Sequence, residues 1–151
     1  MEKLLKTIAS APAVEFINTP EGFTEAAERS LDSTEKVIYY LGSAELLMDA
    51  YEQAYEDGHY IPTRIKRNVL VKMLVEDTPA MQRYRETDAQ QVRETRCLPP
   101  GADFRHSFMV HDDTVVFFMK TDSKAAGLSI VSAAIAETMK TIFDEIWQRG
   151  I

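Results

Sequence analysis

Apolar and polar residues alternate most clearly between Phe104 and Lys120, where two apolar arms flank Asp112-Asp113. Aspartate tolerates the left-handed backbone of a two-residue turn, and Phe, Val and Thr favour strands, so the pattern predicts an antiparallel hairpin. Because side chains alternate along a strand, one face of this hairpin should be apolar. It carries Phe104, His106, Phe108, Val110, Val115, Phe117 and Met119. The other face is mixed, so we expect both faces to be at least partly covered.

The N-terminal half predicts strands that alternate with helices. Residues 1–10 carry Leu4, Leu5 and Ile8 on one side and predict a short helix. So short a helix is marginally stable alone, so we expect it to pack against the domain or a partner chain. The segments that follow predict an edge strand over 13–17, a helix from Thr19-Pro20 to Leu31, a central strand over 35–41 and a helix from Ser43 to about Gly58.

The C-terminal half continues with less regular order. Its segments predict helical turns over 60–68, a buried strand over 69–77, a polar helix after Thr78-Pro79, a strand over 94–98, a loop over 121–126, a short strand over 127–131 and an amphipathic helix from Ser132 to Trp147. We therefore expect an α/β chain with a mixed sheet and helices on both faces. The short helix over 1–10 precedes a single domain over 13–151.

Charge and composition exclude some classes of function. The 151 residues carry 17 Lys plus Arg against 24 Asp plus Glu, a net charge of −7, which disfavours general attraction to nucleic acid or an anionic membrane. The basic cluster Arg64, Lys66, Arg67 and Lys72 is interpreted as a solvated helix end and strand flank rather than an anion site. A lone cysteine, Cys97, is interpreted as a small buried filler, and with no secretory signal the chain is expected in the cytoplasm. We expect no cofactor.

His106 and Asp113 stand seven residues apart in the strand-turn-strand. This spacing resembles the HxKxxxxD signature of the phospholipase D superfamily, whose histidine attacks phosphorus. The position of the lysine is Phe108, and MKTDSKAAG stands where active members carry GSxN. Since one transition-state donor is worth roughly 10²–10³ in rate, we expect no catalysis by this route. His106 is then a core histidine or, as the alternative, a ligand contact.

Two other groups of side chains have simple interpretations. His111, Asp112 and Asp113 could suggest a metal site, but adjacent residues around a turn diverge, which favours a solvated turn. The tyrosines are interpreted as core and rim aromatics, because no basic groove accompanies them as a stacking platform would need. They are Tyr39, Tyr40, Tyr51, Tyr55 and Tyr60.

The segment 110–147 resembles the effector-sensing domain of TrmB-like transcriptional regulators, a non-catalytic branch with a phospholipase D-like fold. The resemblance rests on HDDT, GLSI and IAETMKTIFDEIW, with RETRCLP and IYYLGSAELL upstream, and extends from Val14 onward. It implies a ligand-sensing domain that forms homodimers. In that family a winged-helix DNA-binding domain and a linker helix usually precede the effector domain. We expect this chain to start with at most the tail of such a linker helix. A further sugar-binding β domain of some relatives is also missing, so sugar specificity is not implied.

Two alternatives to the sensing domain stay open: a degenerate or reassigned phosphodiesterase, and a structural interaction module. For the sensing domain we expect no direct binding of DNA and no membrane contact. Ligands of mixed α/β sheets bind beyond the carboxyl ends of strands, which predicts a site for an anionic or sugar-like molecule. Its residues are Ser43, Arg64, Arg96 and His106. The alternative is that Arg64 and Arg96 pair with surface acids such as Glu45 and Glu94.

Overall fold

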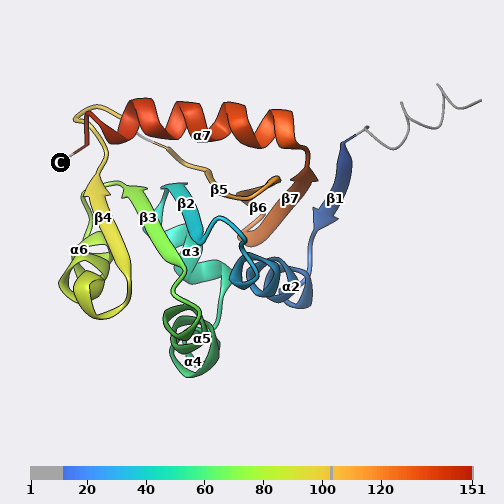
Figure 1. Cartoon of the computed structure of the whole chain (residues 1–151), viewed down its shortest axis with the longest axis horizontal. Coiled ribbons are helices and arrows are strands. Elements are labelled where there is room, and N and C mark those ends of the chain that lie inside the picture. The colour runs from blue at the N-terminus through green and yellow to red at the C-terminus, as the bar shows by residue number, and fades with distance from the viewer. Residues whose placement is uncertain (1–11, 103, 151) are drawn as a thin grey trace, which may run out of the picture.

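The computed structural model describes residues 12–102 and 104–150, which form one seven-stranded mixed sheet flanked by helices (Figure 1). The strand order is β1-β7-β6-β5-β2-β3-β4. The strands are β1 (Ala13–Ile17), β2 (Val37–Gly42), β3 (Leu70–Val75), β4 (Arg93–Cys97), β5 (Ser107–His111), β6 (Thr114–Thr121) and β7 (Lys124–Val131). β2, β3 and β4 run parallel, and all other pairs are antiparallel. The mixed α/β class is confirmed; the helix expected over 1–10 lies outside the described residues.

The helices connect the parallel strands and close the chain. They are α2 (Pro20–Leu31), α3 (Ala44–Ala50), α4 (Gln53–Tyr55), the π-helix η1 (Glu56–Tyr60), α5 (Ile61–Lys66), α6 (Pro79–Thr87), the 3-10 helix η2 (Asp88–Gln90) and α7 (Ala133–Trp147). Thr19, Ser43, Thr78 and Ser132 cap α2, α3, α6 and α7, each accepting a backbone N–H with its hydroxyl oxygen. No helix in the described part of the chain is long and apolar enough to cross a membrane.

The hairpin of β5 and β6 forms around Asp112 as predicted, with Val110 opposite Val115 and Asp112 in the left-handed region at φ 48°. The turn is more than solvated backbone. The Asp112 carboxylate accepts hydrogen bonds from Ser33 Oγ, from Thr34 N and from Glu35 N, at 3.0–3.1 Å. Although burial alone would raise it, the pKa of Asp112 is lowered by these bonds from Glu35, Thr34 and Ser33. The turn therefore fixes the loop between α2 and β2.

A second hairpin replaces the loop expected over 121–126. β6 and β7 pair continuously from Thr114 opposite Val131 to Thr121 opposite Lys124, and Asp122 and Ser123 make the turn with φ of 49° and 65°. The short strand over 127–131 is thus the end of a longer one. The sequence concealed it because the exposed hairpin tip is polar on both faces, which removes the alternation that marks a strand.

The two faces of the sheet are covered differently, as Figure 1 shows. α7 alone lies over one face, and α2, α3, the α4–α5 segment and α6 lie on the other. The predicted alternation in the hairpin is confirmed: Phe108, Val110 and Val115 pack with α7, and the intervening residues pack against the opposite helices. Helices do cover both faces, but unequally.

The single helix expected from Ser43 to about Gly58 is wrong. α3 ends at Ala50, and Tyr51 is extended at φ −126° and ψ 141°. Its ring makes an edge contact with Phe118, with ring centres 6.3 Å apart, and another with Phe23 at 6.2 Å. Anchoring this ring in the core breaks the helical path that local propensity favours. The chain then turns back over the sheet as α4, η1 and α5.

Candidate functional site

The positions that would carry phospholipase D chemistry do not form a catalytic group. Phe108, in the place of the lysine, is 8% exposed in the core beneath α7, and its ring centre lies 6.3 Å from that of Phe117. His106 is exposed just before β5, so its interpretation as a core histidine is wrong. β5 begins one residue later, at Ser107. No metal-binding group of three His, Cys, Asp or Glu residues occurs within 12–102 and 104–150.

Ser43 and the segment around His106 do meet at the carboxyl end of β2. Ser43 N donates to Ser107 Oγ at 2.8 Å, and Ser43 Oγ caps α3 through Leu46 N at 3.2 Å. The contact requires Gly42, which has φ +136° and leaves no room for a Cβ, since Ser107 Oγ would lie 2.4 Å away. The polar atoms of Ser43 are thus committed to holding β2, α3 and β5 together.

Arg64 and Arg96 lie on opposite faces of the sheet. Arg64 is 1% exposed and donates to the carbonyls of Val69, Val92 and Gln91, which ties α5 to the starts of β3 and β4. Its guanidinium is no part of a solvated cluster, contrary to expectation. Arg96 packs over the Trp147 ring at 4.3 Å on the α7 face and donates to the Trp147 carbonyl at 2.9 Å.

The four predicted residues therefore do not converge on one cavity within a chain. Pairing of the arginines with Glu45 and Glu94 is not observed either, because backbone carbonyls accept from both guanidinium groups. Binding of a ligand by these residues stays a prediction, and the single-chain geometry does not favour it.

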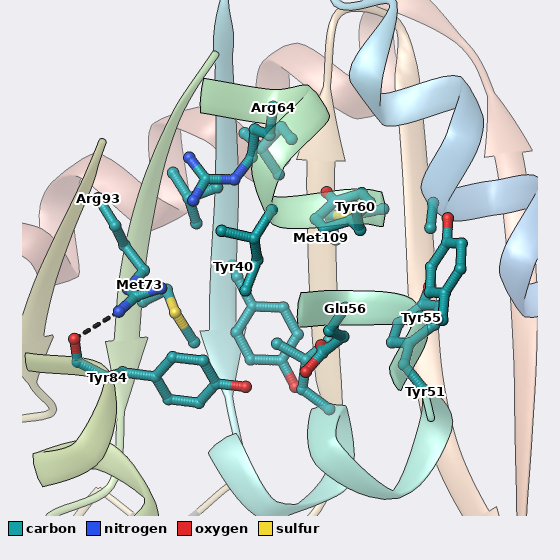
Figure 2. A pocket seen from close by; sticks show the side chains of 15 residues that line it. Tyr40, Tyr51, Tyr55, Glu56, Tyr60, Arg64, Met73, Tyr84, Arg93 and Met109 are labelled. Atoms are coloured by element: carbon teal, nitrogen blue, oxygen red, sulfur yellow. Dashed lines mark hydrogen bonds between the residues drawn. The ribbon is translucent and has the colours of Figure 1, made fainter. Parts of the chain in front are cut away.

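A different cavity, of about 60 Å³, lies between the sheet and the α4–α5 segment (Figure 2). Ile38, Val71, Met73 and Met109 form its apolar floor on the strands. Its polar groups belong to Tyr40, Tyr51, Tyr55, Glu56, Tyr60, Arg64, Tyr84 and Arg93. These residues come from β2, from the segment that follows α3, from α6 and from β4, so tertiary structure alone assembles the site.

Glu56 is the acid of this cavity and the first residue of η1. Figure 2 shows its side chain among those of the labelled tyrosines. Burial, with a smaller contribution from Asp57, raises the pKa of Glu56 to about 7, while Arg93 opposes the shift. Near neutral pH the carboxyl is therefore divided between its neutral and its charged form.

Three tyrosines around the cavity have already donated their hydroxyl protons elsewhere. Tyr40 donates to the Ser43 carbonyl at 2.6 Å, and Tyr55 donates to Glu28 Oε1 at 2.7 Å. Tyr60 Oη and Ser30 Oγ lie 2.8 Å apart, and since the single proton of Ser30 goes to the Ala27 carbonyl, Tyr60 is the donor. Burial raises the pKa of Tyr40, Tyr55 and Tyr60 and keeps these hydroxyls protonated.

Tyr84 is different, because its buried hydroxyl has no hydrogen-bond partner among the described residues. Its backbone carbonyl accepts from Arg93 Nη2, the bond drawn in Figure 2, and the Arg93 guanidinium lies 4.8 Å from its ring centre. A buried polar group without a partner costs about 1–3 kcal/mol. The hydroxyl is thus a place where a ligand can supply a missing hydrogen bond.

Sequence reasoning missed Glu56 and Tyr84. It placed Tyr51, Tyr55 and Tyr60 correctly as core and rim aromatics, but it did not predict that they surround an acid. One signal was present: EDGH from Glu56 to His59 follows the tyrosine-rich stripe. It forms a π-helix, a conformation found often at functional sites.

Comparison with known proteins supports the fold. No family model and no curated protein matches. Among solved structures, the archaeal chromatin protein TrmBL2, which shows a novel mode of DNA binding, matches with a TM-score of 0.63 and 17% identity over 99% of this chain and 59% of its own. Nuc from Salmonella typhimurium, a phospholipase D family member, matches at 0.66 with 18% identity, covering 93% and 97%. NucT from Helicobacter pylori matches at 0.62 with 7% identity, covering 93% and 99%.

At these identities the likeness concerns the fold alone. The chain has a phospholipase D-like mixed α/β fold, shared with TrmBL2, Nuc and NucT. It spans less than two thirds of the length of TrmBL2.

Proposed function

We propose that this chain is a non-catalytic domain that binds a small molecule and pairs with a second copy of itself, in the manner of the effector domain of a TrmB-like regulator. The observation that carries the proposal is the cavity of about 60 Å³ that contains the Glu56 carboxyl and the unpartnered Tyr84 hydroxyl. Polar groups held in such a cavity lower stability unless something binds them. A ligand that completes their hydrogen bonds offsets that cost.

Catalysis is the weaker candidate, because the position where phospholipase D chemistry needs a lysine belongs to the hydrophobic core. Phe108 packs under α7, and a lysine there would place a charge among apolar side chains. We expect no hydrolysis of bis(p-nitrophenyl) phosphate by the wild-type chain. Hydrolysis that disappears in His106→Ala would establish the phosphodiesterase alternative instead.

Exposed apolar side chains at the β1 edge support pairing of two copies. Phe16 is 80% exposed and Val14 57% exposed. They pair with Leu128 and Ile130 of β7, on the face that α7 covers elsewhere. Such a patch on an edge strand favours a protein contact.

Recognition of DNA is not part of the proposed role. The net charge of −7 opposes the phosphate contacts that dominate binding to DNA, and the DNA binding of TrmBL2 is a property of that protein. We expect no specific gel shift of duplex DNA at physiological salt. A reducing compartment such as the cytoplasm suits the single, half-buried Cys97.

A thermal-shift screen of sugars, phosphosugars, nucleotides, amino acids and amines tests the proposal. A compound at 100 times its Kd should stabilise the folded chain by about 2.7 kcal/mol, or roughly 5–10 °C in a domain of this size. The shift should fall in Ala27→Leu, which fills part of the cavity, and persist in Glu45→Gln on the exposed side of α3. A thermal shift that is unchanged in Ala27→Leu, or the absence of any stabilising compound, would contradict the proposal.

A further inference from the structure

We infer that the cavity beneath η1 binds a small organic ammonium compound, held by the Glu56 carboxylate and the surrounding tyrosine rings. The inference rests on the proposed function, since it names the ligand class of the same cavity. It depends on the balance of donors and acceptors, on the aromatic lining, on the charges nearby and on the available space.

Among the tyrosine hydroxyls and the acid around the cavity, acceptors outnumber free donors, and the unpartnered Tyr84 hydroxyl can serve as either. The Tyr40, Tyr55 and Tyr60 hydroxyls donate their hydrogen bonds to the Ser43 carbonyl, Glu28 Oε1 and Ser30 Oγ, so they offer no free donor to a ligand. The Glu56 carboxylate, when ionised, only accepts. Ammonium groups carry no acceptor, and primary to tertiary ones also donate hydrogen bonds, so they complement this set better than an anion does.

The arginines near the cavity are already engaged. Arg93 donates to Asp88 Oδ1 at 2.8 Å, to Gln91 Oε1 at 2.8 Å, to Thr87 Oγ1 at 2.7 Å and to the Tyr84 carbonyl. Arg64 donates to three backbone carbonyls. These bonds hold α5, α6 and β4 in place and use most of the N–H donors of the two guanidinium groups, which leaves few for an anionic ligand.

The charges in the cavity wall are arranged to tolerate a cation near Glu56. Arg93 is paired with the Asp88 carboxylate at 2.8 Å, whereas Arg64 stays charged near neutral pH although burial lowers its pKa to about 10. The Tyr60 hydroxyl is influenced by the charges of both Arg64 and Glu56. Figure 2 shows Arg64 at the opposite end of the cavity from Glu56, so a cation beside the acid avoids the arginine.

The tyrosine rings supply the second attraction. Tyr51 stacks on Tyr55 with ring centres 6.2 Å apart, and Tyr55 lies 6.2 Å from Tyr60. A cation over an aromatic face gains about 0.5–2 kcal/mol, and clustered rings are the usual receptors of quaternary ammonium groups. The carboxylate and the rings therefore favour the same ligand.

Space limits the size of the cationic group. A buried water needs about 10–15 Å³, so 60 Å³ holds roughly four to six water-sized groups, as in a methylated ammonium head. A groove of about 330 Å³ adjoins the cavity, and Tyr51, Glu56, Ile61 and Tyr84 line both. The rest of a longer ligand can occupy this groove, whose charged lining residues besides Glu56 are Asp57 and Arg83.

Calorimetric titration with choline and with its uncharged carbon isostere, 3,3-dimethylbutan-1-ol, tests the inference. Tetramethylammonium and ethanolamine complete the series of probes. At about pH 8, where Glu56 is mostly ionised, we expect at least one ammonium probe to bind, and choline to bind at least tenfold more tightly than the isostere. An isostere that binds as tightly as choline would overturn the inference, because charge would then contribute nothing.

Two variants separate the acid of the cavity from general surface charge. Glu56→Gln keeps the shape of the side chain and should weaken choline binding at least tenfold. Glu52→Gln removes an exposed acid outside the cavity and should leave binding unchanged. Circular dichroism of each variant verifies the fold, and equal losses in both variants would show non-specific attraction and overturn the inference.

The pH profile provides an independent measurement on the wild-type chain. Because the pKa of Glu56 is about 7, the ionised fraction rises about tenfold between pH 6 and pH 8, and choline affinity should rise with it. A flat profile contradicts the role of Glu56.

The outcomes distinguish this inference from the proposed function. If no ammonium probe binds at millimolar concentration while another class of compound binds and is lost in Ala27→Leu, the ammonium inference fails and the cavity remains the ligand site. If no compound of any class binds, the proposed function fails as well.

Discussion

The carboxylate of Asp112 accepts a hydrogen bond of 3.0 Å from the backbone N–H of Thr34, so the tip of one hairpin holds a loop that is distant in sequence. Asp112 → Ala should destabilise the chain by about 2–4 kcal/mol, because it removes three hydrogen bonds and places alanine at φ 48°. Asp112→Asn tolerates the same backbone and should cost less. Urea denaturation measures both, and equal losses would show that the lost carboxylate accounts for the whole cost and that the strained backbone at φ 48° adds nothing.

His111 should make stability fall in mild acid. It is 4% exposed, neither ring nitrogen has a partner among the described residues, and burial lowers its pKa below 6.5. A lowered pKa means that the unfolded chain binds the proton first, so this contribution is present above about pH 6.5 and is lost as the pH falls. In His111→Phe the decline of the melting temperature below about pH 6.5 should be flatter. An unchanged decline would assign it to other groups.

In the ligand-free chain, Glu56 should make stability fall as the pH rises, the opposite of the effect of His111. Its pKa is raised from 4.5 to about 7, so its contribution to stability is complete below about pH 4.5 and is lost as the pH rises through 7. Glu56→Gln should therefore match the wild type at low pH and exceed it by up to about 3 kcal/mol at pH 8. Denaturation at both pH values measures the difference. A variant less stable than the wild type at pH 8 would mean that the ionised carboxylate has a stabilising partner.

Phe16 should contribute to pairing of two chains. Light scattering of the wild type should give twice the 17.1 kDa mass of one chain, and Phe16→Glu should shift it toward one. Glu15→Gln, on the other side of β1, serves as the matched control. A wild type that stays at the mass of one chain at tens of micromolar would contradict the dimer.

Elements that depend only on neighbouring residues were predicted correctly from the sequence. The Asp112-Asp113 turn and the four hydroxyl caps need only neighbouring residues, so they were readable from sequence. The break at Tyr51 was not, because its cause is the contact with Phe23 and Phe118 from other elements. Burial of Arg64 was also hidden, since its acceptors are the carbonyls of Val69, Gln91 and Val92.

The candidate site could not be predicted from the sequence, because its residues lie far apart in the chain and meet only in the folded structure. Tyr40, Glu56 and Tyr84 meet only because β2 and β3 pair in register and because α6 and the η1 segment pack on the same face. Sequence reasoning looked instead beyond the carboxyl ends of the strands. There the structure places Ser43 against Ser107, the residue after the predicted His106, and Ser43 N donates to Ser107 Oγ.

Hydrogen exchange measured by mass spectrometry on the full chain, with and without hits from the thermal-shift screen, locates the ligand. Binding in the cavity should slow exchange over residues 53–66, which form the cavity wall, and over the end of α6 near Tyr84. Slower exchange confined to the segments around Ser43 and His106, with 53–66 unchanged, would contradict it and return the site to the ends of the strands.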